Sequence, residues 1–255
     1  MATALVSSIT HAWAATRISL YKRWKDRCFI RWNSGDARPS LRVLNRGELT
    51  SQSVEQFVEN TRCFSKVHVD LGTGDGKHVY RQAKQFPQIY FVGVDLHPET
   101  MSYFSWKMSR KPARGGGIYN ASYLCSSLLG LPPSLSQFAN SISVNYPWGS
   151  LLSDLVTPNP SALTQISNLA KEGGSLEILL NYTVFQNPTY AKSLKLPSID
   201  DAYIRSRLYP TYRSHGIRLT SHEVQRTAGN KSSWGQKLTL GGQREVLRIL
   251  GTIKK

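Results

Sequence analysis

The sequence contains few acidic side chains. It has 16 Asp and Glu residues against 32 Lys and Arg, which gives a formal net charge of +16 at pH 7. An excess of positive charge on this scale is typical of proteins that bind phosphate backbones or anionic membranes. We expect a nucleic acid as the partner, and a basic surface that only keeps the protein in solution is the alternative.

Cysteine and long apolar runs are also scarce. Cys28, Cys63 and Cys125 are scattered and form no Cys-x-x-Cys pair, so neither a disulfide framework nor a zinc site is indicated, and we expect no bound metal. No stretch approaches the roughly 18 consecutive apolar residues of a membrane-spanning helix. We therefore expect a cytoplasmic protein that is not attached to a membrane.

The chain divides near residue 40. Its 255 residues suffice for one domain of ordinary size with extensions. Residues 1–40 include the Arg- and Trp-rich stretch "RISLYKRWKDRCFIRW" and show no regular apolar spacing, so we treat them as a basic N-terminal extension. An RNA-binding arm, a transit-like peptide and translated upstream sequence are open interpretations of it. Residues 41–255 are predicted to form the folded domain.

The folded domain begins with a predicted hairpin, "LRVLNRGELT", and a capped helix, "TSQSVEQFVENT". Strands are then predicted at "KVHVDL", "IYFVGVD", "IYNASYLC", "SISVNYPW" and "SLEILL", with helices at 78–85, 98–110 and 163–171. The segments "GIRLTSHEV", "GQKLTLG" and "REVLRILGTI" are predicted to close the sheet as an antiparallel hairpin. This alternation is typical of an α/β fold whose mostly parallel sheet is covered on both faces.

A glycine-rich stretch, "DLGTGDGKHVY", follows the first of the alternating strands. A P-loop requires Gly-x-x-x-x-Gly-Lys-Ser/Thr, but His78 stands where the Ser or Thr would be and the spacing differs. A dinucleotide-binding turn requires Gly-x-Gly-x-x-Gly, whereas Gly72, Gly74 and Gly76 alternate. The pattern favours neither of these phosphate-binding turns.

The same stretch fits S-adenosylmethionine, because glycines without Cβ atoms allow the backbone to approach the amino-acid end of that ligand. Asp70 can then lie beneath the ammonium group and the sulfonium region. Asp95 ends the next predicted strand about 20 residues further on, where an acid commonly binds ribose hydroxyls. A purely structural turn capped by Asp75 is the alternative.

Two tryptophans are candidates for the substrate site. Trp148 lies in "NYPWGS" after the fourth predicted strand, at the carboxyl edge where open α/β sheets bind ligands. Trp234 lies in the loop-like stretch "NKSSWGQKL". An exposed indole stacks on a nucleobase with a gain of ~1 to 3 kcal/mol, so we expect the two rings to enclose one flipped base. Ordinary packing is the alternative for each of them.

Basic residues gather beside the predicted site. Four cations occur within eight residues at the end of a predicted helix and in the loop after it, more than a solvated helix terminus requires. They are Lys107, Arg110, Lys111 and Arg114. Further cations lie between the fifth strand and the end of the chain, among them Lys195 and Arg244.

From about Leu41 to its end, the chain resembles the aminoglycoside-resistance 16S rRNA (adenine(1408)-N(1))-methyltransferases. The stretches that carry the resemblance are "VHVDLGTGDGKHVY", "VGVD", "RKPARGGG", "ANSISVNYPWGSLL", "LKLPSIDDAY" and "SSWGQKL", in the order of that family. The resemblance implies a class I S-adenosylmethionine-dependent fold, with a Rossmann-like seven-stranded sheet that ends in an antiparallel hairpin. It also implies that the partner is 16S rRNA within the 30S subunit, and we expect a monomer.

The resemblance implies roles for individual residues. The cofactor would be bound by Asp70, Gly72, Thr73, Gly74, Asp95, Leu128 and Leu129. The target base would be held by Trp148, Trp234 and the supporting hydroxyl of Ser232. RNA would be contacted by Lys107, Arg110, Lys111, Arg114, Lys195, Lys237 and Arg244. Leu129 and Gly242 depart from the family pattern, since an acid and a basic residue, respectively, are common there.

Adenine N1 keeps a lone pair at neutral pH, so in-line attack on a sulfonium methyl requires orientation more than a catalytic base. We therefore expect the six histidines to be structural.

Three other functions remain as alternatives. "NYPW" resembles the motif of adenine-N6 methyltransferases, a transfer RNA guanine-N7 methyltransferase shares the Pro-Trp strand end, and a non-catalytic RNA-binding scaffold would retain the fold alone.

Overall fold

The computed structural model describes residues 40–111, 116–186, 191–192, 195–227 and 244–254. The N-terminal extension, apart from Ser40, lies outside these residues, as does the predicted strand "GQKLTLG". Within the described part of the chain, no helix is long and apolar enough to cross a membrane.

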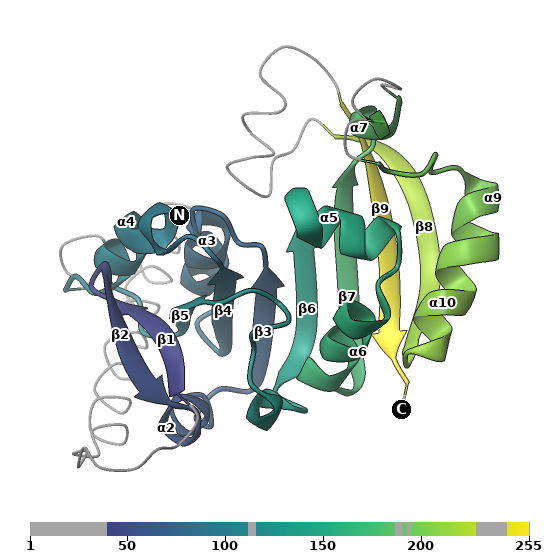
Figure 1. Ribbon diagram of the computed structural model, residues 1–255. Helices are drawn as coiled ribbons and strands as arrows, with labels where there is room; N and C mark the ends of the chain where they lie inside the picture. The colour runs from purple at the N-terminus through teal and green to yellow at the C-terminus, as the bar shows by residue number, and fades with distance from the viewer. Residues whose placement is uncertain (1–39, 112–115, 187–190, 193–194, 228–243, 255) are drawn as a thin grey trace, which may run out of the picture.

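The described strands form one mixed sheet with the order β2-β1-β5-β4-β3-β6-β7-β9-β8 (Figure 1). Their bounds are β1 Ser40–Asn45, β2 Glu48–Ser53, β3 Lys66–Leu71, β4 Ile89–Asp95, β5 Ala121–Cys125, β6 Ala139–Asn145, β7 Ala170–Asn181, β8 Ile217–Thr227 and β9 Arg244–Ile253. Strands β3 to β7 are parallel to their neighbours in this group, whereas β9 runs antiparallel to both β7 and β8. The predicted α/β fold class is therefore confirmed.

Seven of the predicted strand segments correspond to β3 through β9, and the predicted N-terminal hairpin enlarges the same sheet to nine described strands. Strand β1 pairs antiparallel with β5 through Val43 and Leu44. The hairpin turn is also fixed to a helix, because Gly47 N donates to Ser105 Oγ at 3.1 Å and Ser105 Oγ donates to Leu44 O at 3.0 Å. The hairpin is thus part of the domain rather than a separate appendage.

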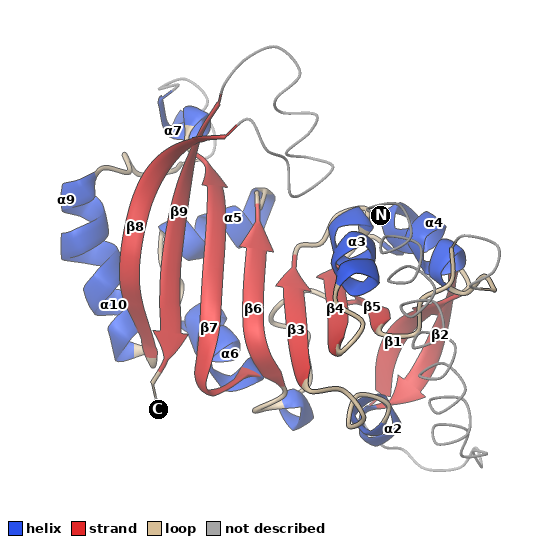
Figure 2. Cartoon of the chain, turned by 180° about the vertical axis from the view of Figure 1, so that it is seen from behind, coloured by secondary structure: helices blue, strands red, loops and turns tan. Residues whose placement is uncertain are grey.

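Helices cover both faces of the sheet. Their bounds are α2 Val54–Glu59, α3 Lys77–Gln85, α4 Pro98–Met108, α5 Gly149–Val156, α6 Pro160–Leu169, α7 Thr183–Gln186, α9 Asp201–Tyr203 and α10 Tyr209–Ser214, with short helices η2 Pro133–Leu135 and η3 Ile204–Leu208. Helices α3 and α4 lie on one face, and α5, α6 and α10 lie on the other, as the front and back views agree (Figures 1 and 2). The sequence predicts α2, α3 and α4. It predicts a helix at 163–171, which begins three residues later than α6 and ends two residues later, since Ala170 and Lys171 belong to β7.

The main core lies between the sheet and α5, α6 and α10. Strand β3 shows how the period of two divides its residues: Val67, Val69 and Leu71 enter this core, and His68 and Asp70 point to the opposite face. A smaller core under α3 and α4 contains Val79, Phe91, Met101 and Tyr123, among others. The buried polar residues of β3 therefore lie on the α3 and α4 side of the sheet.

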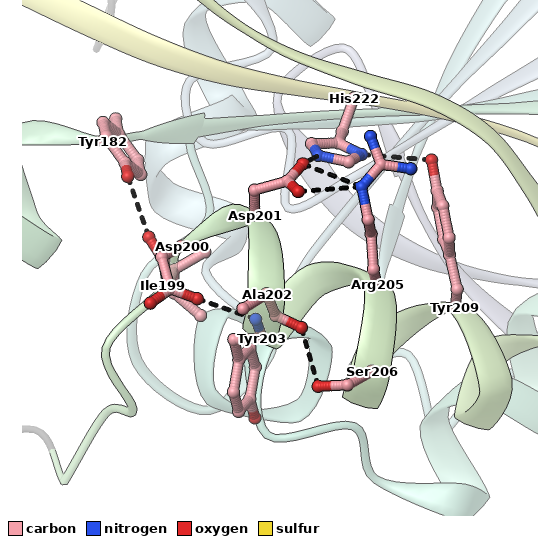
Figure 3. Close-up of polar contacts among 10 residues, drawn as sticks. All are labelled: Tyr182, Ile199, Asp200, Asp201, Ala202, Tyr203, Arg205, Ser206, Tyr209 and His222. Atoms are coloured by element: carbon pink, nitrogen blue, oxygen red, sulfur yellow. Dashed lines mark hydrogen bonds and ion pairs between the residues drawn. The ribbon is translucent and has the colours of Figure 1, made fainter.

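The short helices between β7 and β8 are held to the sheet by a polar cluster (Figure 3). Arg205 Nε donates to both carboxylate oxygens of Asp201, at 3.0 and 2.8 Å, and His222 Nε2 of β8 lies 2.7 Å from Asp201 Oδ1. Tyr209 OH lies 3.1 Å from His222 Nδ1. The hydrogen bond from Arg205, and secondly that from His222, hold the pKa of Asp201 below its ordinary value of 3.8.

We expect Asp201→Asn to loosen residues 200–209 without unfolding the domain. The lowered pKa means that the ionised Asp201 stabilises the folded state above pH 3.8, and that this contribution is lost as the pH falls through the folded-state pKa. Hydrogen exchange should therefore show faster exchange at Ile204 and Arg205 in the variant at pH 7. Glu55→Gln, an exposed change on α2, is the control, and equal protection in Asp201→Asn and wild type would contradict the assignment.

Candidate cofactor and substrate cleft

A cleft with a volume of about 730 Å³ opens at the carboxyl ends of β3, β4, β5 and β6. Strand order reverses at β3, since β4 lies on one side and β6 on the other, and open α/β sheets bind ligands at such a switch point. A volume of this size lies within the ~300 to 1,000 Å³ usual for small-molecule and cofactor sites. The predicted residues that line it are Asp70, Gly72, Thr73, Gly74, Asp95, Leu128, Leu129 and Trp148.

The glycine turn occupies the cleft floor between β3 and α3. Gly72, Gly74 and Gly76 all have positive φ, at 70°, 62° and 74°, a conformation that other residues rarely adopt. Tyr123 OH donates to Gly76 O at 2.7 Å and supports the turn from below. Asp75 Oδ1 accepts from Lys77 N at 3.0 Å, so the alternative of an Asp-capped turn describes one feature of this loop correctly. The capping leaves the cleft side of the turn open.

Asp95 joins the glycine turn to the end of β4. Its Oδ2 accepts from Gly74 N at 2.9 Å and its Oδ1 accepts from His97 N at 3.2 Å. Thr100 Oγ1 donates to Gly74 O at 2.9 Å and fixes the same turn to α4. Each oxygen of Asp95 therefore makes one bond to the backbone and keeps a second lone pair for a ligand.

Asp70 is buried, with 1% of its surface exposed, yet its side chain reaches the cleft. Its Oδ1 accepts from Ser143 Oγ at 2.6 Å and from Asn145 Nδ2 at 2.7 Å, both on β6. Within the described residues, no hydrogen bond reaches its Oδ2. A buried carboxylate with one unoccupied oxygen at a cleft is suited to a cationic group of a ligand.

Three further observations fit a cofactor with an amino-acid end and an apolar end. A Cβ atom on Gly72 would lie 2.8 Å from Leu151 Cδ2, so only glycine leaves this part of the cleft open. Within the described part of the chain, the buried Thr73 Oγ1 has no hydrogen-bond partner. Leu128 and the 54%-exposed Leu129 supply an apolar wall after β5. The residues present therefore fit S-adenosylmethionine.

We expect Gly72→Ala to weaken the binding of S-adenosylmethionine roughly tenfold. The added methyl group would lie 2.8 Å from Leu151 Cδ2, so the end of this cleft-lining side chain has to shift. Gly173→Ala is a matched control, because Gly173 has φ +72° and nothing within 4 Å of the added Cβ. Both variants bear the positive-φ cost of about 1 kcal/mol, but only Gly72→Ala should change the Kd measured by calorimetry. Equal Kd values would contradict this geometry.

Trp148 stands at the rim of the cleft and begins α5 as its N-cap. Its side chain is 37% exposed. The chain bends sharply on either side of it, since Tyr146 and Gly149 both have positive φ, at 52° and 58°. The Tyr146 ring packs against Leu179 and Val246, which holds this strained backbone in place.

The other predicted residues that the structure describes do not line the cleft. Lys107 Nζ lies 5.3 Å from the centre of the Tyr80 ring, Arg110 lies 5.2 Å from the Trp106 ring, and Lys111 is exposed after α4. Lys195 is exposed in the segment before α9, and Arg244 begins β9. Arg114, Ser232, Trp234, Lys237 and Gly242 lie outside the described residues.

Sequence reasoning missed several residues of the cleft. Ser126 and Ser127 line it directly after β5, and their position after a predicted strand was a usable signal. Thr100 and Asp154 line it from helices. Ser143 carries no signal of its own, because its partner Asp70 lies 73 residues earlier in the chain.

Comparison with known proteins gives a consistent result. A family model described as NpmA, 16S rRNA (adenine(1408)-N(1))-methyltransferase, matches residues 45–253. The enzyme of that name from Escherichia coli is 28% identical over 219 residues, which are 84% of this chain and 99% of the relative. The one from Streptoalloteichus tenebrarius is 31% identical over 202 residues, 78% of this chain and 92% of the relative.

Comparison with solved structures indicates the same family as the sequence comparison. A variant of the 16S rRNA (adenine(1408)-N(1))-methyltransferase from Catenulisporales acidiphilia with cosubstrate SAM superposes with a TM-score of 0.78 and 26% identity, over 84% of this chain and 97% of that chain. The antibiotic-resistance methyltransferase Kmr superposes with a TM-score of 0.71 and 36% identity, over 84% and 99%. The chain therefore belongs to the 16S rRNA (adenine(1408)-N(1))-methyltransferase family and is an S-adenosylmethionine-dependent methyltransferase.

Proposed function

We propose that the protein methylates N1 of adenine 1408 in 16S rRNA of the 30S subunit and thereby confers resistance to aminoglycosides. The observation that carries the proposal is a single cleft in which the glycine turn, Asp70 and Asp95 face the exposed indole of Trp148. The relatives over most of the chain bear the name of this reaction.

Residues of β3 and β4 are proposed to bind the cofactor. S-Adenosylmethionine supplies an electrophilic methyl group on a sulfonium. Asp70 Oδ2 would accept from the ammonium group, and the second lone pairs of Asp95 would accept from the ribose hydroxyls. Thr73 would line the cleft beside the glycine turn, and Leu128 and Leu129 would contact the adenine. These contacts would orient the methyl group toward the side of the cleft where Trp148 lies.

Residues after β6 are proposed to hold the target base. Adenine N1 lies on the pairing edge, so the base must leave its stack before N1 reaches the methyl group. The indole of Trp148, 37% exposed and lining the cleft, would stack on one face of the base, and Trp234 with Ser232 would support the other side. No side chain has to remove a proton, because N1 attacks through its own lone pair. The protein would thus act by orientation and exclusion of water.

Cations outside the cleft are proposed to bind the rRNA backbone. Lys107 and Arg110 are positioned by the aromatic rings of Tyr80 and Trp106, and a guanidinium or ammonium fixed in this way still presents donors to a phosphate. Lys111, Arg114, Lys195, Lys237 and Arg244 complete the proposed set. Binding through several separate phosphates favours a shaped particle such as the 30S subunit, and we expect the protein to act on it as a monomer in the cytoplasm.

The test is incubation of purified 30S subunits with the protein and S-adenosylmethionine, followed by nucleoside mass spectrometry and primer extension through the decoding site. N1-methyladenosine and a block at adenine 1408 are expected. A local similarity to transfer RNA (guanine-N(7)-)-methyltransferase of Streptococcus pneumoniae, 32% over 68 residues, covers only 27% of this chain and 30% of the relative. Guanine-N7 methylation of transfer RNA without a change in 30S subunits would replace the proposal by that alternative.

A further inference from the structure

A partly buried chain of polar side chains runs behind Asp70 along β3 and β6. His68 Nδ1 lies 2.8 Å from Ser141 Oγ, and His68 Nε2 lies 2.9 Å from Ser143 Oγ. Ser143 Oγ donates to Asp70 Oδ1 at 2.6 Å. The link arises because these residues point to the same face of two adjacent strands, where Asp70 is paired with Ser143 and His68 with Ser141.

The hydrogen positions along this chain follow from counting donors. The Ser143 hydroxyl has a single proton, and at 2.6 Å from an ionised Asp70 that proton must lie toward the carboxylate. Ser143 Oγ can therefore only accept from His68, so Nε2 of His68 carries a hydrogen. In a neutral imidazole, Nδ1 is then the acceptor, and the Ser141 hydroxyl donates to it. All the bonds run in one direction, from Ser141 to Asp70.

The surroundings keep His68 in this form. Burial lowers the pKa of His68, while Asp70 raises it, His78 lowers it and Glu177 raises it by smaller effects. The imidazole ring also packs against Phe91, with 5.3 Å between the ring centres. Neutral and sterically fixed, the ring presents its Nε2 hydrogen to Ser143 in one direction.

The chain fixes only one of the two Asp70 oxygens. Oδ1 receives both Ser143 Oγ and Asn145 Nδ2, and Asn145 Nδ2 also donates to Ser143 Oγ at 3.2 Å. With Oδ1 occupied, the rotation of the carboxylate is fixed and Oδ2 remains for the cleft. We propose that His68, acting through Ser143, is a positioning residue that orients the Asp70 carboxylate toward the ammonium group of the cofactor. This inference rests on the proposed contact between Asp70 and that group.

The affinities for two ligands distinguish a positioning role of His68 from a general contribution of His68 to the stability of the fold. S-Adenosylhomocysteine has the amino-acid end that Asp70 would bind, whereas 5′-methylthioadenosine lacks it and keeps the adenosine. In Ser143→Ala and His68→Ala we expect the Kd for S-adenosylhomocysteine to rise roughly tenfold, with the Kd for 5′-methylthioadenosine within about twofold of wild type. His68→Gln retains a donor near the position of Nε2 and should restore most of the affinity.

Ser175→Ala is the matched control, because Ser175 lies on β7 beside Ser141 in the sheet register but outside this chain of bonds. Calorimetry on the full chain without RNA measures all the variants. An equal loss of affinity for both ligands, or no loss of affinity for S-adenosylhomocysteine in Ser143→Ala, would overturn the inference. If His68→Ala does not fold, Ser143→Ala and His68→Gln still decide the matter. If the Kd values change as expected but adenine 1408 is not methylated, the proposed target is wrong and the positioning role of His68 stands.

Discussion

Replacing Trp148 by alanine is expected to reduce methyl transfer to 30S subunits about a hundredfold. Stacking on an aromatic side chain contributes ~1 to 3 kcal/mol per base, and the flipped base loses its alignment with the methyl group as well as this contact. The affinity for S-adenosylmethionine should stay within about threefold, because Asp70, Asp95 and the glycine turn are unchanged. Single-turnover transfer of labelled methyl groups and calorimetry measure the two quantities.

Trp148→Phe keeps an aromatic face and should retain transfer within about tenfold of wild type. Leu49→Ala removes a comparably exposed large apolar side chain, 39% against 37%, from β2 and outside the cleft. It should change transfer by less than about threefold. Transfer by Trp148→Ala at the wild-type rate would show that the indole does not hold the target base.

Asp95→Ala is expected to weaken cofactor binding about fiftyfold. The change removes the proposed acceptor for the ribose hydroxyls, and it also leaves the backbone N–H groups of Gly74 and His97 without their carboxylate partner. Hydrogen bonds to charged groups contribute ~1.5 to 3 kcal/mol each, so loss of one ligand bond and of the order in the turn accounts for this size. Calorimetric titration with S-adenosylmethionine measures it.

Asp95→Asn should give an intermediate loss, since its single amide oxygen accepts only part of these bonds. Asp154→Asn is the matched control, because Asp154 lines the same cleft but accepts from Asn159 rather than from the glycine turn. Its Kd should stay within about threefold of wild type. A Kd for Asp95→Ala as low as that of Asp154→Asn would exclude Asp95 from the cofactor site.

The sequence predicts well which residues line the cleft on the side of the glycine turn, because the features on that side are local. Three alternating glycines after an apolar run indicate a turn with positive φ. Asp70 is the last residue but one of β3 and Asp95 is the last residue of β4, and each strand is recognisable by itself. The edge of the sheet then brings them together. Thr73, Leu128 and Leu129 were placed by family resemblance, and the structure brings all three into the cleft.

The partners of Asp70 could not be predicted in the same way. The pattern "SISVN" indicates only that Ser141, Ser143 and Asn145 share one face of a strand. Which strand lies beside that face depends on the sheet order, and β3 and β6 are separated by two strands and two helices in the chain. Similarly, the N-terminal hairpin was predictable from its turn, but its pairing with β5 was not. The role proposed for His68 had no local signal in the sequence for the same reason.

Because strand order reverses at β3, separate stretches of the chain line the proposed cofactor position and the proposed target position. Residues from β3 to the loop after β5, with Ser143 and Asn145 of β6 behind Asp70, surround the proposed cofactor position, and residues after β6 surround the proposed target. Substitutions or insertions in the second stretch can therefore change which nucleotide is presented while the methyl donor remains bound as before. Such an enzyme can therefore evolve from one RNA target to another while it continues to bind its cofactor.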